Sequence, residues 1–112
     1  MGFRKVIAII RPDCLEKVEQ ALQGLAIPGM SVSKVKGYGE YADFYERDWM
    51  SGHVRIEIFT PQSQARAIAE AILDVAHTGL SGDGIVAIQP VETVLHIQSR
   101  SVLTGKTGSR KS

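Results

Sequence analysis

Two glycine-rich segments have the residue types that bind phosphate groups. Segment 78–84 reads TGLSGDG, and segment 37–39 reads GYG at the end of a predicted strand. Glycine permits backbone conformations in which several N–H groups turn toward one anion. Neither segment ends in the Gly-Lys-Ser/Thr of a Walker A motif. Taken alone, each segment is therefore either a phosphate cradle or a simple turn.

Few other side chains are placed to do chemistry. Glu57 alternates with apolar residues on a predicted strand, so it is either a catalytic carboxylate or a group that binds a ligand or an ion-pair partner. The spacing of His53, His77 and His96 matches no metal motif, and Cys14 is the single cysteine. No nucleophile elbow is present. We therefore predict a binding protein with no metal site and no catalytic residue.

Alternating and apolar runs predict the strands that must position these residues. Pro90 separates the fourth strand from a short C-terminal one, and residues 40–52 have no clear period and are predicted to form a loop. The predicted strands are 5–10, 31–36, 54–58, 85–88 and 93–98.

Two helices are predicted between these strands. Asp13 followed by Glu16 resembles a capping box, and an apolar stripe over 15–25 continues that helix. Thr60 is a predicted N-cap before Pro61, and a second stripe runs over 65–76. The order is β-α-β-β-α-β with a short extra C-terminal strand, which indicates an α+β, ferredoxin-like sandwich.

One face of this sheet is predicted to need a partner. Two helices cover only one face of a four-stranded sheet, yet residues 6–10 are apolar on both faces. Self-association is the simplest way to cover the second face.

Composition favours one small domain. The chain has 112 residues, is 44% hydrophobic and 22% charged, and has a net charge of +1. Its longest apolar run, 6–10, is too short to cross a bilayer, and the charged start lacks a signal-peptide pattern, so we expect a cytoplasmic protein. We assign residues 1–98 to the domain and the basic segment 99–112 to a flexible C-terminal tail.

Six ordered segments together resemble the PII nitrogen-regulatory signal protein family, over residues 4–98. The resemblance implies a ferredoxin-like fold assembled as a homotrimer, with adenine nucleotides in the clefts between subunits. It also implies that a mobile T-loop, about 40–52, regulates a protein target. The matching segments are IIRP at 9–12, GMSV at 29–32, VKGYG at 35–39, RIEI at 55–58, TGLSGDG at 78–84 and PVE at 90–92.

The resemblance also implies roles for individual residues in nucleotide binding. Those implied to lie around the adenine and ribose are Ile9, Ser31, Glu57 and Phe59. Those implied to approach the nucleotide from one subunit are Gly37, Tyr38 and Gly39. Those implied to wrap the ribose and phosphates are Thr78, Gly79, Gly82, Asp83 and Gly84.

Three departures from the family pattern remove positive charge from the phosphate site. Ile85 stands where the family has a lysine, and His96 and Gln98 stand where it has arginines. Charge-assisted hydrogen bonds contribute about 1.5–3 kcal/mol each, so ATP should lose most and ADP or AMP least. Arg47 or Arg100 could supply compensating contacts to an anion.

The T-loop departs from the family as well. It is shorter, and Tyr41 stands where the family has a glutamine that helps to bind magnesium and 2-oxoglutarate. A phenol is a poor ligand for a hard cation, so this replacement argues against a response to 2-oxoglutarate. It is also acidic and contains Phe44, Tyr45 and Trp49. These features are similar to those of a PII-like branch associated with carboxysomes and bicarbonate transport, which implies a response to ADP or AMP together with bicarbonate.

Three other functions compete with this interpretation. The first is a PII-type regulator of nitrogen metabolism or of an ammonium transporter. The second is a small phosphate-handling enzyme on the same fold, whose chemistry needs an arginine and an asparagine, but the chain has no Asn. The third is an RNA-binding module, which would stack bases on sheet aromatics, whereas the aromatics here cluster in 38–49. We therefore expect no nucleic-acid partner and a transporter or enzyme as the protein target.

Overall fold

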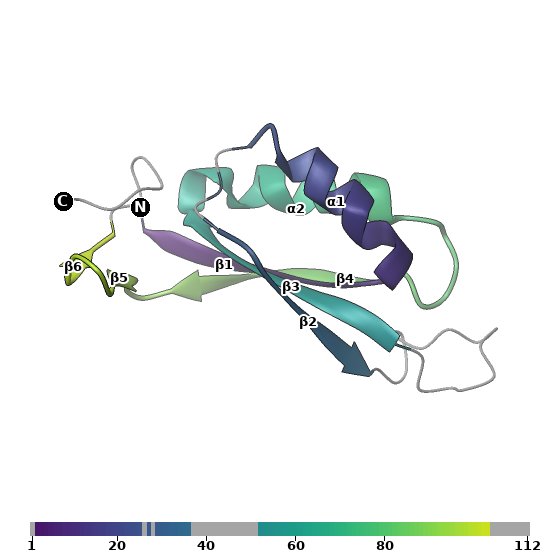
Figure 1. The fold of residues 1–112 in the computed structure, drawn as a ribbon. Helices are drawn as coiled ribbons and strands as arrows, with labels where there is room; N and C mark the ends of the chain where they lie inside the picture. The colour runs from purple at the N-terminus through teal and green to yellow at the C-terminus, as the bar shows by residue number, and fades with distance from the viewer. Residues whose placement is uncertain (1, 26, 28, 37–51, 104–112) are drawn as a thin grey trace.

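Two helices pack on one face of a four-stranded antiparallel sheet, which confirms the predicted α+β, ferredoxin-like βαββαβ fold (Figure 1). The sheet order is β2-β3-β1-β4. The strands are β1 (Phe3–Ile10), β2 (Ser31–Lys36), β3 (Gly52–Pro61) and β4 (Gly84–Val91), and the helices are α1 (Leu15–Leu22) and α2 (Gln62–Ala76). The computed structural model describes residues 2–25, 27, 29–36 and 52–103.

The core lies between the helices and the sheet. Val6 of β1 pairs with Ile58 of β3 and Ile88 of β4, and alternate residues along these strands face the helices. Ile68 and Ile72 of α2 are completely buried against this face, because the apolar stripe of the helix recurs every three or four residues. The fully buried strand residues that complete the core are Ala8, Ile10, Ile56 and Ile58.

Among the residues that the structure describes, none forms a layer over the opposite face of the sheet. Ile7 and Ile9 point to this face and are half-buried, and Phe59 on the neighbouring strand is 43% exposed. Strand β1 is thus apolar on both faces, as the sequence predicts. We call this surface the uncovered face.

The helix starts differ from the predicted ones. Residues 12–14 form a 3-10 helix, and α1 begins at Leu15 without a side-chain cap, so the expected capping box from Asp13 is wrong. Thr60 does not cap α2 either, because its hydroxyl is buried and donates to the carbonyl oxygen of Pro61. Instead, the first N–H of the helix, from Gln62, donates to the carbonyl oxygen of Gly2 at 2.8 Å.

The C-terminal part of the fold is more extensive than predicted. Pro90 does not break β4, because β4 is an edge strand. The N–H that proline lacks is not needed on the open side of an edge strand. In place of one strand over 93–98, two short strands, β5 (Leu95–His96) and β6 (Ser101–Val102), pair as a hairpin. The proposed boundary at residue 98 falls in the turn of this hairpin, and Arg100 N–H donates to His96 O at 2.8 Å. We refer to residues 92–103 as the hairpin.

Two predicted segments extend beyond this description. Of the T-loop, 40–52, only Gly52 is described, as the first residue of β3, and the tail over 104–112 lies outside the described residues. No helix formed by the residues that the structure describes has the length and hydropathy needed to cross a bilayer.

Candidate functional site

The glycine-rich loop between α2 and β4 is organised by the carboxylate of Asp83. Its Oδ2 accepts hydrogen bonds from the backbone N–H groups of Thr78, at 2.8 Å, and Gly79, at 2.9 Å, while Oδ1 accepts one from the Thr78 hydroxyl. The N–H of Leu80 donates to the Thr78 hydroxyl oxygen at 3.2 Å. The first half of the loop is therefore tied to its last residues by one side chain. We call residues 77–84 the glycine loop.

Asp83 is held in its charged form. Burial opposes its ionisation, but the hydrogen bonds from Thr78, Gly79 and Arg11 outweigh burial and hold the pKa of Asp83 well below its usual range. Arg11 Nε lies 3.3 Å from Oδ1, and His77 Nδ1 lies 4.0 Å from Oδ2. A carboxylate engaged in this way is suited to shaping the loop, and a general base would need a raised pKa instead.

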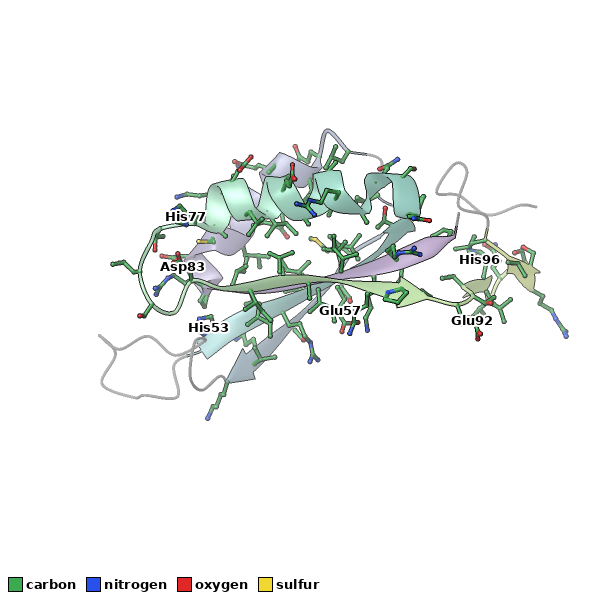
Figure 2. All side chains as sticks on the ribbon, turned by 180° about the vertical axis from the view of Figure 1, so that it is seen from behind. His53, Glu57, His77, Asp83, Glu92 and His96 are labelled. Atoms are coloured by element: carbon green, nitrogen blue, oxygen red, sulfur yellow. The ribbon has the colours of Figure 1, made fainter. Side chains whose placement is uncertain are left out.

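Two side chains hold the glycine loop from outside. Arg11 Nη2 donates to the carbonyl oxygen of Ser81 at 2.5 Å, and His53 Nε2 lies 2.8 Å from the carbonyl oxygen of Gly82. Arg11 follows β1, and His53 belongs to β3 and is only 2% exposed. Figure 2 shows His53 near Asp83 at the same end of the sheet. The loop is thus fastened to two strands that are distant in sequence.

The glycines of this loop adopt backbone conformations that L-residues avoid. Gly79, Gly82 and Gly84 have φ values of 87°, 91° and 105°. At Gly84 a side chain would also overlap the carbonyl oxygen of Ile9 on the paired strand. The predicted special-backbone loop is confirmed, and it brings Ile9 beside Gly84.

A second group of the predicted residues lies farther along the uncovered face. Ser31 pairs with Glu57 across β2 and β3, and Glu57 Oε2 lies 3.8 Å from both Lys5 Nζ and Arg55 Nε. Lys5 Nζ also stands 5.9 Å from the ring centre of Phe59. Of the two interpretations of Glu57, a carboxylate with ion-pair partners fits this geometry better than a catalytic acid.

This second group opens into a groove of about 630 Å³ that the hairpin walls on one side. The hairpin wall was missed by sequence reasoning, which treated 93–98 as one flat strand. His96 faces the groove, and its Nδ1 accepts a hydrogen bond from Ser99 N–H at 3.3 Å. The lining residues are Phe3, Gly29, Met30, Ser31, Glu57, Phe59, Val94, Leu95, His96, Ile97, Gln98 and Leu103.

The glycine loop and the hairpin lie at opposite ends of the sheet, and Glu57 lies between them (Figure 2). Asp83 and His96 are at opposite ends of the sheet in Figure 2. Between them, β4 runs from Gly84 to Val91, which corresponds to roughly 20 Å of strand. Arg100 is in the hairpin turn with a φ of 57°, so it is remote from the glycine loop. The remaining predicted contacts, Gly37, Tyr38, Gly39 and Arg47, lie outside the described residues.

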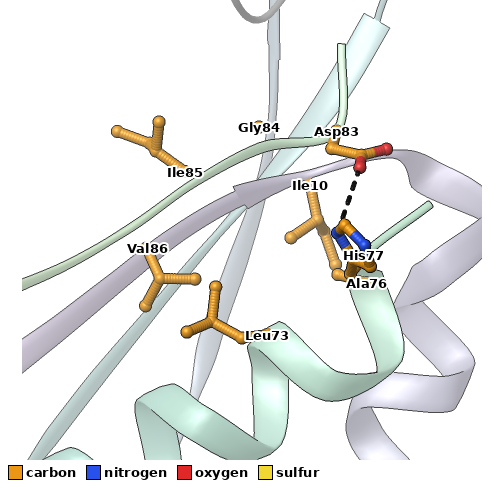
Figure 3. A pocket seen from close by; sticks show the side chains of 8 residues that line it. All are labelled: Ile10, Leu73, Ala76, His77, Asp83, Gly84, Ile85 and Val86. Atoms are coloured by element: carbon orange, nitrogen blue, oxygen red, sulfur yellow. Dashed lines mark ion pairs between the residues drawn. The ribbon is translucent and has the colours of Figure 1, made fainter. Parts of the chain in front are cut away.

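A shallow pocket of about 140 Å³ borders the glycine loop on its helix side. Figure 3 shows that Ile85 and Val86 point to opposite sides of β4, with Val86 directed toward Leu73 of α2. The pocket lining is mostly apolar, and His77 and Asp83 are its polar members. Ile85 therefore contributes an apolar surface next to the loop.

The described part of the chain contains no cluster of three His, Cys, Asp or Glu side chains that could hold a metal ion. Its histidines lie apart: His53 contacts the glycine loop from β3, His77 follows α2, and His96 is in the hairpin (Figure 2).

Comparisons with known proteins agree with this fold. Residues 3–101 match the family model described as Nitrogen regulatory protein P-II. The chain is 36% identical over 115 residues to Nitrogen regulatory protein GlnK2 of Haloferax mediterranei, a match that covers 96% of this chain and 89% of that protein. It is 37% identical over 104 residues to Nitrogen regulatory protein P-II of Nostoc punctiforme, covering 87% and 93%.

A solved structure gives the same answer at the level of the fold. The crystal structure of Arabidopsis thaliana PII bound to citrate superposes with a TM-score of 0.79 at 28% identity, covering 99% of this chain and 94% of that one. The relatives of this chain are named as regulatory proteins, so the family is one of signalling proteins and not of enzymes. Since the family model and the relatives each span nearly the whole chain, the protein belongs to the nitrogen regulatory protein P-II family.

Proposed function

We propose that this protein is a PII-like signalling subunit that binds adenine nucleotide between the subunits of a homotrimer and regulates a transporter or enzyme through its T-loop. ADP and AMP bind at least as well as ATP in this proposal. The observation that carries it is the separation of the glycine loop from the hairpin on one chain. The glycine loop is at one end of the sheet, and the groove at Ser31, Glu57 and Phe59 adjoins the hairpin at the other.

This separation argues that each site is completed by a neighbouring subunit. The family's three phosphate-facing cations correspond to Ile85, His96 and Gln98. Ile85 pairs with Ile9 beside the glycine loop, whereas the hairpin follows the far end of β4, roughly 20 Å away. That is far more than a triphosphate spans, so one phosphate chain meets all three positions only if the hairpin comes from another copy. The uncovered face, with Ile7 and Ile9, is the surface such an assembly would bury.

The residues at these positions support the preference for ADP and AMP. Ile85 has no charge, and Gln98 has only an amide. His96 accepts Ser99 N–H at Nδ1, which leaves Nε2 as the nitrogen that offers a hydrogen to the groove. One hydrogen bond of this kind stabilises a bound phosphate less than the two charge-assisted hydrogen bonds of an arginine would.

Isothermal titration with AMP, ADP and ATP tests the nucleotide proposal, and light scattering tests the assembly. We expect a homotrimer that binds ADP or AMP at least as tightly as ATP. A clear ATP preference that persists in Arg47→Ala and Arg100→Ala would contradict the assignment of the phosphate positions. A stable monomer at micromolar concentration would contradict the shared site.

We also propose a second, small-anion ligand, bicarbonate, because the short, aromatic segment 40–52 resembles the T-loop of the PII-like branch associated with bicarbonate transport. The acidic side chains of this segment disfavour binding of an anion without help, so Arg47 or backbone N–H groups must provide the positive end. Regulation of inorganic carbon uptake or of carboxysome function follows from this ligand. Trp49 is the single tryptophan, so its emission should shift more with ADP plus bicarbonate than with ADP alone. Identical spectra, with no coupling between the ligands in calorimetry, would remove bicarbonate from the proposal.

A second candidate is a regulator of nitrogen metabolism or ammonium transport. The names of the relatives, nitrogen regulatory proteins throughout the most similar group, favour it. This candidate predicts that 2-oxoglutarate with magnesium and ATP binds, whereas Tyr41 in place of a glutamine argues against that response. Calorimetric titration of 2-oxoglutarate distinguishes the two candidates.

A further inference from the structure

His53 stands apart from the residues that the family resemblance assigns to nucleotide binding. It is 2% exposed, lies at the second position of β3, and has its Nε2 at 2.8 Å from the carbonyl oxygen of Gly82. A carbonyl oxygen only accepts hydrogen bonds, so Nε2 carries hydrogen in this contact. Gly82 is itself buried, and a carbonyl left without a partner there would be costly.

The contact controls the direction of a peptide group in the glycine loop. In the trans peptide between Gly82 and Asp83, the carbonyl oxygen and the N–H point in opposite directions. While His53 holds the oxygen on one side, the N–H of Asp83 is directed to the other, where the carbonyl oxygen of Leu80 accepts it at 3.3 Å. The carboxylate of the same Asp83 receives the donors at Thr78 and Gly79.

We propose that His53 is a positioning residue for the nucleotide site, which holds the Gly82 carbonyl against β3 so that this oxygen does not face a phosphate bound at the glycine loop. The inference rests on the proposed nucleotide-binding function of this loop. A carbonyl oxygen turned toward a phosphate would repel it, whereas oriented N–H groups attract it. Arg11 acts in the same sense on Ser81 from the other side, at 2.5 Å.

The placement of His53 also links the start of β3 to the glycine loop. β3 begins at Gly52, and the next residue, His53, is hydrogen-bonded to the carbonyl oxygen of Gly82 in the glycine loop. Displacement of the first residues of β3 would therefore be transmitted to Gly82 through this hydrogen bond. The link joins residues 29 positions apart in the chain.

Substitution of His53 tests the inference in the full-length protein. His53→Phe keeps a planar ring but removes the donor, whereas His53→Gln places an amide N–H near the position of Nε2. Amide hydrogen exchange over residues 79–84 and calorimetry with ADP are the two readouts. Removing one buried hydrogen bond should raise exchange in the loop and weaken ADP binding by about tenfold in His53→Phe, with much of both restored in His53→Gln.

Val18→Ala is the matched control for a general loss of stability. Val18 is completely buried in α1 and makes none of the hydrogen bonds of the loop, so this variant should raise exchange broadly and leave ADP affinity unchanged. Uniform exchange changes in His53→Phe, like those of Val18→Ala, would overturn the inference. So would unchanged loop exchange and unchanged affinity.

A measurement on the unmodified protein covers the case in which His53→Phe does not fold. The imidazole of His53 should show a slowly exchanging Nε2–H in nitrogen-15 spectra, and a ring with hydrogen on Nδ1 alone would overturn the inference. If the unmodified protein fails to bind ADP, the proposed function falls, while loop exchange in the variants still decides whether His53 positions the loop.

Discussion

The two ends of the sheet differ in how far one chain completes them. At the glycine loop, Arg11 donates hydrogen bonds to Asp83 and to the Ser81 carbonyl, and His53 bonds to the Gly82 carbonyl. These bonds are 2.5–3.3 Å long and lie within one chain. At the hairpin, Leu95 is 64% exposed and Ile97 is 92% exposed. The hydrogen bonds of the loop are thus made within the subunit, whereas the hairpin offers the most exposed apolar side chains, which still have to be covered. Changes at the loop should therefore act on stability as well as on binding, and changes at the hairpin mainly on binding.

Gly84→Ala should have the largest effect on stability, because it disrupts the pairing of β4 with β1 beside the glycine loop. The added Cβ overlaps the carbonyl oxygen of Ile9, and the φ of 105° is itself unfavourable for alanine. We expect a loss of unfolding free energy of about 3 kcal/mol or more, measured by urea denaturation.

Gly24→Ala is the matched control for this substitution. Nothing lies within 4 Å of a Cβ at Gly24, so its unfolding free energy should change by less than about 0.5 kcal/mol. Equal effects of the two substitutions would show that the close contact between β4 and β1 does not limit stability.

Asp83→Asn should have the next largest effect, because it removes the charge that organises the loop. We expect a loss of about 2 kcal/mol at neutral pH, since charge-assisted hydrogen bonds from Thr78 and Gly79 are weakened. The pKa of Asp83 is lower in the folded state than in the unfolded state, so its contribution is present above the unfolded value of about 3.9 and lost as the pH falls below it.

The pH dependence provides the control for this prediction. The difference in unfolding free energy between the parent protein and Asp83→Asn should be constant from neutral pH to about pH 5 and should shrink below about pH 4. A difference that stays the same, or grows, on acidification would mean that Asp83 is not held ionised by the loop.

Gln98→Arg should have the smallest effect on stability and would sharpen the contrast at the hairpin. Gln98 is exposed and lines the groove, so an arginine there should leave the unfolding free energy within about 0.5 kcal/mol of the parent value. In calorimetry it should raise the affinity for ATP relative to AMP by about tenfold, because it restores one charged phosphate contact.

Gln20→Arg is the charge-matched control, on the exposed surface of α1 and away from the groove. It should change neither stability nor the ratio of affinities. If Gln98→Arg behaves like Gln20→Arg, the hairpin does not face the phosphates.

Most of the sheet and the second helix could be predicted because their signals are local. Val54, Ile56 and Ile58 alternate with polar residues, and the stripe over 65–76 has a helical period. The hairpin could not be predicted in this way. Its turn over 97–100 contains no glycine, and Arg100 adopts a positive φ that sequence patterns rarely assign to arginine.

The candidate site was predictable to the extent that glycines and family motifs mark it. The loop over 78–84 was found from composition, whereas its clamp by Arg11 and His53 depends on pairing between strands far apart in sequence. His53 has no pattern that distinguishes it from a surface histidine, and only the tertiary structure brings it to Gly82. The cap of α2 by Gly2 escaped prediction for the same reason.

The central position of β1 has a consequence for synthesis of the chain. β1 is made first, but its two neighbours are β3 and β4, and the latter ends only at Val91. Until then, β1 has at least one open edge of unpaired N–H and C=O groups. Nascent or truncated chains that end before Gly84 should therefore aggregate readily, and productive folding should wait until most of the chain has left the ribosome.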